Sequence, residues 1–424
     1  MKIIQICGLL EGAGITRYMI EMRNAFISAG YEVESYVCQH EDDEDLKKNW
    51  QTMKEVKYYD YTEKSFEHIC EADIVCIHQL MPAKADKKYR DPFMQLLKDI
   101  NGPKKVFFIN GHNVIGYKFY GIDILEDKEF LMSFDRIATF YHTTPLFRKI
   151  KETIGEDEAM KRFIQIHHPY KFDEDCKDKW LSLDNKANRV TYIGRWAQFK
   201  NPMLMQKLHK VARDEFEFEM RGILPMIGVA SVPDLFYEMR DDKKLSFKDK
   251  IIGPSQYTYK ITAKWKREHG VDTKDLLLDY PHGNRMFIFG PYKRDDGMKA
   301  IAKSKFGVDF YYLKDSTYYG DNVEYAQLEI IEQGAIPMFD LFTAKSVNMY
   351  VDGKTTNTSI YDNNLGVSLS NDMSNVKEVI EQMKELAYDE KKYNDMRERC
   401  FEAFVKHTDP QTIGKTFVDE ILKS

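Results

Sequence analysis

The chain of 424 residues is too long for one ordinary domain and comfortable for two, each able to bury its own core. A net charge of -6 excludes a surface coated in basic side chains, so contact with nucleic acid would need a local patch. The six cysteines are scattered, which predicts reduced thiols. The N-terminus lacks a signal-peptide pattern, and no apolar run approaches the roughly 18 residues of a membrane span. These features predict a cytoplasmic protein without membrane contact.

Short apolar runs recur in the first half of the chain at intervals that leave room for helices. Between the first two runs, Ile15, Met19, Met22 and Phe26 fall on one helical face, and Gly30 stands where a helix would stop. Strands that alternate with helices predict a parallel sheet. The runs cover residues 3–7, 33–38, 74–78, 106–109, 137–141 and 164–167.

The second half repeats this rhythm, with apolar runs at residues 190–193, 216–220, 286–289, 306–310 and 336–339. The fold class is therefore α/β, with two Rossmann-like domains facing a cleft. A polar stretch between Pro169 and Asn188 marks the boundary. We expect a first domain over residues 1–172, a second over 188–400, and a tail over 401–424.

Three glycines, Gly8, Gly12 and Gly14, lie between the first predicted strand and the first helix. Such a loop lets backbone amides approach a phosphate or a sugar at a helix N-terminus, where the helix dipole favours negative charge. The spacing is neither G-x-G-x-x-G nor a P-loop, which disfavours a dinucleotide oxidoreductase and an NTPase.

A pair of cations, Arg195 and Lys200, follows the apolar run that starts the second half. Arginine offers a planar fork of donors and lysine a compact charge, so together they suit a diphosphate. A solvated basic pair is the alternative interpretation.

Residues 324–337 place Glu324 near a helix start and Glu329 one to two turns further on, before a glycine-containing turn into a strand. An ionised carboxylate can accept two hydrogen bonds from a vicinal diol, so this pattern favours sugar hydroxyls as partners. An ordinary amphipathic helix-to-strand connection is the alternative, because Leu328, Ile331 and Ile336 are already explained as core.

Together these segments resemble the retaining glycosyltransferases with two Rossmann domains (GT-B), and most closely the DNA α-glucosyltransferases of T-even bacteriophages. The resemblance rests on residues 8–16 with 21–23, 193–200, 302–307 and 324–337. Glu324 and Glu329 have the close spacing of the phage enzymes, whereas Glu332 stands at the wider spacing of the superfamily. The resemblance also implies that the C-terminal tail packs back on the first domain.

The resemblance implies a UDP-sugar donor. Arg195 and Lys200 would hold the diphosphate, Glu329 the ribose and Glu324 the donor sugar, while Gly12 and Gly14 would contribute backbone contacts.

His112, just after a predicted strand, is similar to a histidine of the family and is the further catalytic candidate. It could hold a sugar hydroxyl or the departing oxygen, or act as a base toward the acceptor. A loop histidine without a role is the alternative.

A metal is not expected. Asp173 and Asp175 form a D-x-D pattern, which another glycosyltransferase fold uses to hold a divalent cation, but they lie in the predicted linker. Arg195 and Lys200 would do the same electrostatic work.

Candidates for DNA contact are Tyr257, Tyr259, Lys260, Lys293 and Arg294. Aromatic rings among cations could stack on an exposed base and contact phosphates, although a helical insertion with a wet basic face is an alternative.

The function that follows is transfer of glucose or arabinose, with retention, from a UDP-sugar to 5-hydroxymethylcytosine in phage DNA, in the cytoplasm of an infected bacterium. Two alternatives stay open. One is a cellular GT-B enzyme acting on a saccharide or a lipid-linked acceptor, and the other is a nucleotide-sugar-binding protein without catalysis.

Overall fold

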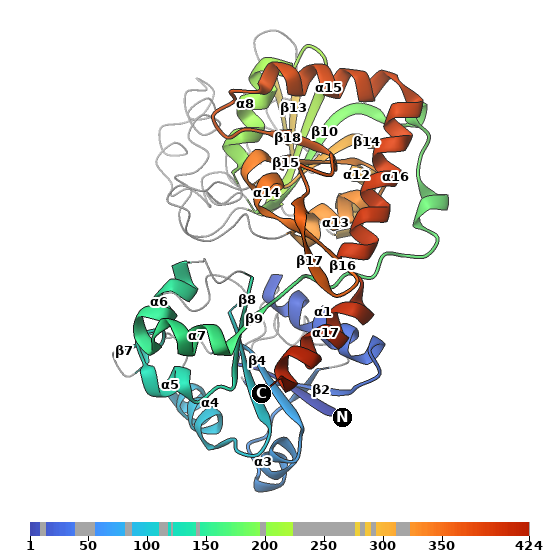
Figure 1. The fold of residues 1–424 in the computed structure, drawn as a ribbon. Coiled ribbons are helices and arrows are strands. Elements are labelled where there is room, and N and C mark those ends of the chain that lie inside the picture. Colours follow the sequence, from blue (N-terminus) through green and yellow to red (C-terminus); the bar gives the residue numbers. More distant parts are fainter. Residues whose placement is uncertain are drawn as a thin grey trace.

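The computed structural model describes residues 1–8, 14–38, 56–80, 87–109, 118–119, 122–140, 145–195, 201–223, 276–279, 285–289, 294–310 and 323–423. They form two α/β bodies, each built around a seven-stranded sheet, and both chain ends lie in the first body (Figure 1).

The first sheet is parallel throughout, with strand order β3-β2-β1-β4-β5-β8-β9. Six of its strands coincide with the predicted apolar runs to within a few residues. The seventh, β3, is a three-residue edge strand that the pattern missed. The strands are β1 (Lys2–Cys7), β2 (Glu32–Val37), β3 (Val56–Tyr58), β4 (Ile74–Gln79), β5 (Lys104–Ile109), β8 (Arg136–Thr139) and β9 (Phe163–Gln165).

In the described residues, helices follow β1, β3, β4 and β8 along the chain, and the small pair β6 (Lys118–Phe119) and β7 (Ile122–Asp123) lies outside the sheet. The first helix follows the predicted pattern: Met19, Met22 and Phe26 are fully buried, and Gly30 ends the turn with φ of +90°. The helices are α1 (Gly14–Ser28), α3 (Glu63–Cys70), α4 (Lys87–Asp99), α5 (Lys128–Met132), α6 (Pro145–Ile154) and α7 (Glu156–Arg162).

The second sheet has the order β12-β13-β11-β10-β14-β15-β18, and only its β12–β13 pair is antiparallel among the described strands. Its five predicted runs are all strands, whereas the two edge strands, β12 and β18, were not predicted. The strands are β10 (Ala187–Arg195), β11 (Glu217–Ile223), β12 (Leu276–Asp279), β13 (Arg285–Phe289), β14 (Ser304–Val308), β15 (Ile336–Asp340) and β18 (Val367–Leu369).

The second body also carries a hairpin, β16 (Asn348–Val351) and β17 (Lys354–Ser359), which projects toward the first body (Figure 1). Its helices are α8 (Pro202–Ala212), α12 (Arg294–Ala302), α13 (Tyr325–Glu332), α14 (Leu341–Ser346), α15 (Val376–Tyr388) and α16 (Glu390–His407). Among the described residues, no helix is long and apolar enough to cross a membrane.

Two segments cross between the bodies and are bonded to each other. On the way out, Tyr170 donates its backbone N–H to the carbonyl of Thr408, and on the way back the Thr408 hydroxyl donates to the carbonyl of Tyr170, at 2.9 and 3.2 Å. His168 is buried beside this crossing, and its Nδ1–H donates to the Val323 carbonyl at 2.8 Å. The crossing is thus an ordered joint built from both segments.

The returning segment ends in α17 (Pro410–Leu422), which packs against α1 of the first body (Figure 1). Phe417 stacks on Phe108 with ring centroids 5.1 Å apart and lies 5.9 Å from Phe26. Gly414 allows the close approach, because a Cβ there would lie 2.3 Å from the Ala25 carbonyl oxygen. The C-terminal helix is therefore part of the core of the first body.

We expect Gly414→Ala to destabilise the protein by about 1–3 kcal/mol, since the added methyl group must push α17 away from the backbone of α1. Thermal unfolding of this variant beside Gln411→Ala, an exposed position on the same helix, measures the effect. Equal stability of the two variants would show that the helices separate at no cost.

Candidate functional site

Three predicted site residues that the structure describes, Gly14, Arg195 and Glu324, lie at the carboxyl ends of strands in the two sheets. In each sheet the chain reverses its direction of strand addition, between β1 and β4 in the first and between β10 and β14 in the second. Open α/β sheets bind ligands at the carboxyl ends of the strands at such a switch point. α1 begins after β1, and α13 comes after β14, so the N-termini of both helices belong to these two edges.

Glu324 is the N-cap residue of α13. Its backbone N–H donates to Oε1 of Gln327 at 3.0 Å, and the Gln327 amide donates in turn to the Asp309 carbonyl at 3.1 Å. Gln327 is fully buried, so this chain of bonds ties the first turn of α13 to the end of β14. The position of Glu324 is thereby fixed relative to the sheet edge.

The other end of α13 is anchored to the linker through Glu332. The Glu332 carboxylate accepts from the Tyr170 hydroxyl at 2.6 Å and from the Asp173 backbone N–H at 3.0 Å. Its carbonyl accepts from the Trp180 indole N–H at 2.8 Å. Glu332, the wider-spaced alternative, is therefore engaged by the linker, whereas Glu329 contacts the opposite body.

The buried residue Lys186 also contacts the C-terminal end of α13. The Lys186 ammonium donates to the carbonyls of Ala302 and Gln333 at 2.6 and 3.4 Å, which lie at the C-termini of α12 and α13. Burial lowers the pKa of Lys186 to about 7, yet the carbonyl ends of two helices favour a cation there. Gln327 near its start and Glu332 and Lys186 near its end thus anchor α13 to neighbouring segments.

Glu329 forms an ion pair with the first body. Nη1 of Arg17, on α1, lies 2.6 Å from Oε1 of Glu329, whose side chain is 8% exposed. The Arg17 guanidinium also lies over the Tyr325 ring, 4.4 Å from its centroid, and the His168 ring stacks on Tyr325 at 4.6 Å. Sequence reasoning missed Arg17. Its signal was a cation three residues after the glycine loop, beside the buried face of α1.

Arg195 is the last residue of β10, next to the point where the second sheet reverses. Gly194 before it has φ of +151°, and a Cβ at this glycine would lie 3.5 Å from Oδ1 of Asp309 on the neighbouring segment. The backbone thus brings Arg195 to the same sheet edge as the start of α13. α8 begins at this edge too, with Asn201 as the N-cap whose side chain accepts from the Leu204 N–H at 3.2 Å.

The remaining predicted site residues are described in part or not at all. Gly14 and Arg294 are described by their backbones only, as the first residues of α1 and α12. The other predicted residues lie outside the described ones: Gly12, His112, Lys200, Tyr257, Tyr259, Lys260 and Lys293.

The carboxylates of the D-x-D pattern flank a lysine. Lys179 lies 2.8 Å from Asp175 and 3.7 Å from Asp173, and all three side chains are well exposed. Within the described ranges, no group of three or more acidic, histidine or cysteine side chains is arranged to hold a metal ion. The absence of a metal requirement stays a prediction.

His78 lies near the carboxyl end of β4, close to where such sheets bind ligands, but it is a packing residue. The ring is buried, stacks on Phe108 at 4.3 Å and has Nε2 2.8 Å from the Gln5 amide nitrogen. Burial lowers the pKa of His78 to about 3, so the ring is neutral at physiological pH.

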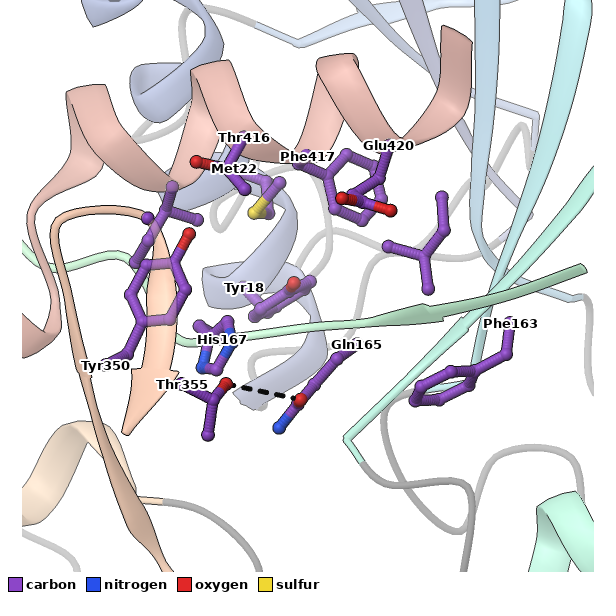
Figure 2. Close-up of a pocket in the computed structure, with 13 residues that line it drawn as sticks. Tyr18, Met22, Phe163, Gln165, His167, Tyr350, Thr355, Thr416, Phe417 and Glu420 are labelled. Carbon is purple, nitrogen blue, oxygen red and sulfur yellow. Dashed lines mark hydrogen bonds between the residues drawn. The ribbon is translucent and has the colours of Figure 1, made fainter. Parts of the chain in front are cut away.

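A cavity of about 240 Å³ lies at the joint of the two bodies (Figure 2). Side chains of α1, β9, α17 and the β16–β17 hairpin line it, and Thr355 donates to Gln165 across it at 3.4 Å. The two carboxylates predicted to bind the donor, Glu324 and Glu329, do not line this cavity.

Comparisons with known proteins agree with this architecture. No family model matches the chain. The DNA α-glucosyltransferase of Enterobacteria phage T4 is 22% identical over 98% of each chain. Among solved structures, an α-glucosyltransferase in complex with UDP-glucose and DNA containing an abasic site has a TM-score of 0.72 at 20% identity, over 100% of this chain and 99% of that one. Anabaena HepE in complex with UDP-glucose has a TM-score of 0.54 at 9% identity, over 99% and 98% of the two chains.

The α/β fold with two Rossmann-like domains, predicted from the sequence, is therefore confirmed, and so is the likeness to the phage DNA α-glucosyltransferase.

Proposed function

We propose that this protein is a retaining glycosyltransferase that moves a sugar from a UDP-sugar to the hydroxymethyl oxygen of 5-hydroxymethylcytosine in DNA. The observation that carries the proposal is the meeting of the two switch points. Arg195 and the start of α13 share the carboxyl edge of the second sheet, and Glu329 on α13 touches Arg17 on α1 of the first. A nucleotide-sugar bound between the carboxyl edges of the two sheets would have a cation beside its diphosphate and carboxylates beside its hydroxyl groups.

Each donor residue has a distinct task in this proposal. Arg195 and Lys200 neutralise the diphosphate as its bond to the sugar breaks, which is electrostatic stabilisation of a developing anion. Glu329 accepts from the ribose hydroxyls and Glu324 from the sugar. The N-terminus of α1, where Gly14 stands, and the preceding Gly12 present backbone amides to negative charge.

The transfer exchanges one bond to the anomeric carbon for another. The bond from this carbon to the β-phosphate oxygen breaks, and a bond to the hydroxymethyl oxygen forms on the same face, which retains the configuration. The hydroxyl proton passes to a base or to the departing phosphate oxygen. His112 is the proposed partner of one of these two oxygens.

Support for the DNA acceptor comes from the T4 relative and from solved structures of similar fold that contain DNA together with UDP-glucose or UDP. Tyr257, Tyr259, Lys260, Lys293 and Arg294 are the proposed contacts. Either glucose or arabinose fits the proposed roles of the carboxylates.

Incubation of the protein with hydroxymethylated DNA and a panel of UDP-sugars, followed by mass measurement of the digested nucleosides, tests the proposal and identifies the sugar. Transfer only to saccharides or lipid-linked acceptors would favour a cellular GT-B enzyme instead. Binding of UDP-sugars without turnover on any acceptor would favour a binding protein.

We expect activity to survive an excess of EDTA, because Arg195 and Lys200 supply fixed positive charge at the diphosphate. The measurement is the transfer rate before and after chelation, with and without added Mn²⁺ or Mg²⁺. Complete loss in EDTA that either metal restores would contradict this expectation and point to Asp173 and Asp175.

A further inference from the structure

We propose that Arg17 is a positioning residue for the donor, acting through Glu329. The inference rests on the proposed function, in which Glu329 accepts from the ribose diol. Arg17 would fix the carboxylate in the orientation that the ribose requires, and would do so only when the two domains are together.

The contact joins elements that are far apart in sequence. Arg17 lies in the first turns of α1, whereas Glu329 lies on α13 of the other domain. Nη1 of Arg17 is 2.6 Å from Oε1 of Glu329, and Nε of Arg17 is 3.5 Å from Oε1 of Glu21. The guanidinium therefore bridges a carboxylate of its own helix and one of the opposite domain.

Aromatic rings hold the guanidinium in place. Its carbon lies 4.4 Å from the centroid of Tyr325 and 5.6 Å from that of Tyr170. Exposed ion pairs contribute little because water screens them and both side chains lose freedom. Here the side chains are 29% and 8% exposed, and the stacked rings restrict Arg17 further. This geometry is specific to a planar guanidinium, which a lysine ammonium cannot reproduce.

The carboxylate can serve both partners. A carboxylate has two oxygens and about four acceptor sites, so an arginine on Oε1 leaves acceptor capacity for a hydroxyl pair. Arg17 also stands three residues after Gly14, where the helix N-terminus faces the phosphates in the proposed site. A donor would therefore contact Glu329 of one domain and the N-terminus of α1 of the other. By linkage, its binding should favour the arrangement in which the two domains are in contact.

The test is calorimetric binding of UDP and of 2′,3′-dideoxy-UDP, which lacks the diol, to the full-length protein. Arg17→Ala should weaken UDP binding about tenfold and dideoxy-UDP binding less than twofold. Arg17→Lys should fall between Arg17→Ala and the unmodified protein. Arg162→Ala is the matched control, because Arg162 pairs with Glu158 at 2.6 Å within one helix of the first domain. It should bind both ligands normally.

Glu329→Ala separates failure of this inference from failure of the proposed function. Support requires that Glu329→Ala also weakens UDP selectively and that the double variant with Arg17→Ala binds no more weakly than Glu329→Ala alone. Selective loss in Glu329→Ala with normal binding by Arg17→Ala overturns the inference and leaves the donor site standing. Equal losses of both ligands in Arg17→Ala overturn it as well. Normal UDP binding by Glu329→Ala removes the ribose role itself, and with it the inference.

Discussion

Lys200→Ala should reduce turnover at least a hundredfold while the protein still folds and binds its acceptor. A charge-assisted hydrogen bond to a developing anion is commonly worth about 3 kcal/mol, which corresponds to this loss. Lys200 comes directly before Asn201, the N-cap of α8, and five residues after Arg195 at the end of β10. The loss should appear mainly in kcat, because the negative charge on the diphosphate grows as the bond to the sugar breaks.

The matched control is Lys207→Ala. Lys207 is an exposed residue on α8. Its substitution removes the same charge at a position outside the proposed site, so this variant should keep full activity. Steady-state rates with saturating UDP-sugar and DNA, together with circular dichroism of each variant, complete the comparison. Near-normal turnover by Lys200→Ala would contradict the assignment of Lys200 to the diphosphate.

The core of both sheets could be predicted from the sequence because buried parallel strands are short, apolar and separated by helices. The strands that escaped prediction have physical reasons to do so. β3 and β18 are three-residue edge strands, too short to show a period. β17 reads Lys-Thr-Thr-Asn-Thr-Ser, which lacks an apolar face because most of the strand is solvent-accessible.

Contacts between segments that are distant in the sequence were harder to predict. Gly414 in α17 has no special local pattern, and its role appears only because Ala25 of α1 lies against it. The resemblance implied a returning tail, but periodicity could not. Arg17 is a similar case: a lone cation on an amphipathic helix usually faces water, and its partner Glu329 is over 300 residues away.

The three glutamates at residues 324, 329 and 332 show how far sequence spacing can distinguish the roles of carboxylates. The sequence offered Glu324, Glu329 and Glu332 as carboxylates of one helix, and only packing distinguishes them. Glu332 is bonded to Tyr170 and the linker, which assigns it to the joint of the domains. Glu324 and Glu329 stay predictions as donor ligands, now with a defined helix start and an interdomain partner.

Double-stranded DNA that contains 5-hydroxymethylcytosine should accept the sugar, and the same DNA with unmodified cytosine should not, because cytosine lacks the nucleophilic hydroxyl. The difference should be all or none. Matched duplexes of one sequence, differing only in the hydroxymethyl group, provide the control, with transfer read from the mass of the nucleosides.

The salt dependence of DNA binding should be shallow. Affinity falls on logarithmic axes with a slope of about 0.9 per neutralised phosphate, and a chain with a net charge of -6 should neutralise only a few. A shallow slope would also suit an enzyme that must release abundant DNA after each transfer. Binding isotherms at several salt concentrations measure the slope. A steep slope would require a basic surface that the composition disfavours, and efficient transfer to free saccharides with none to hydroxymethylated DNA would remove the DNA acceptor from the proposal.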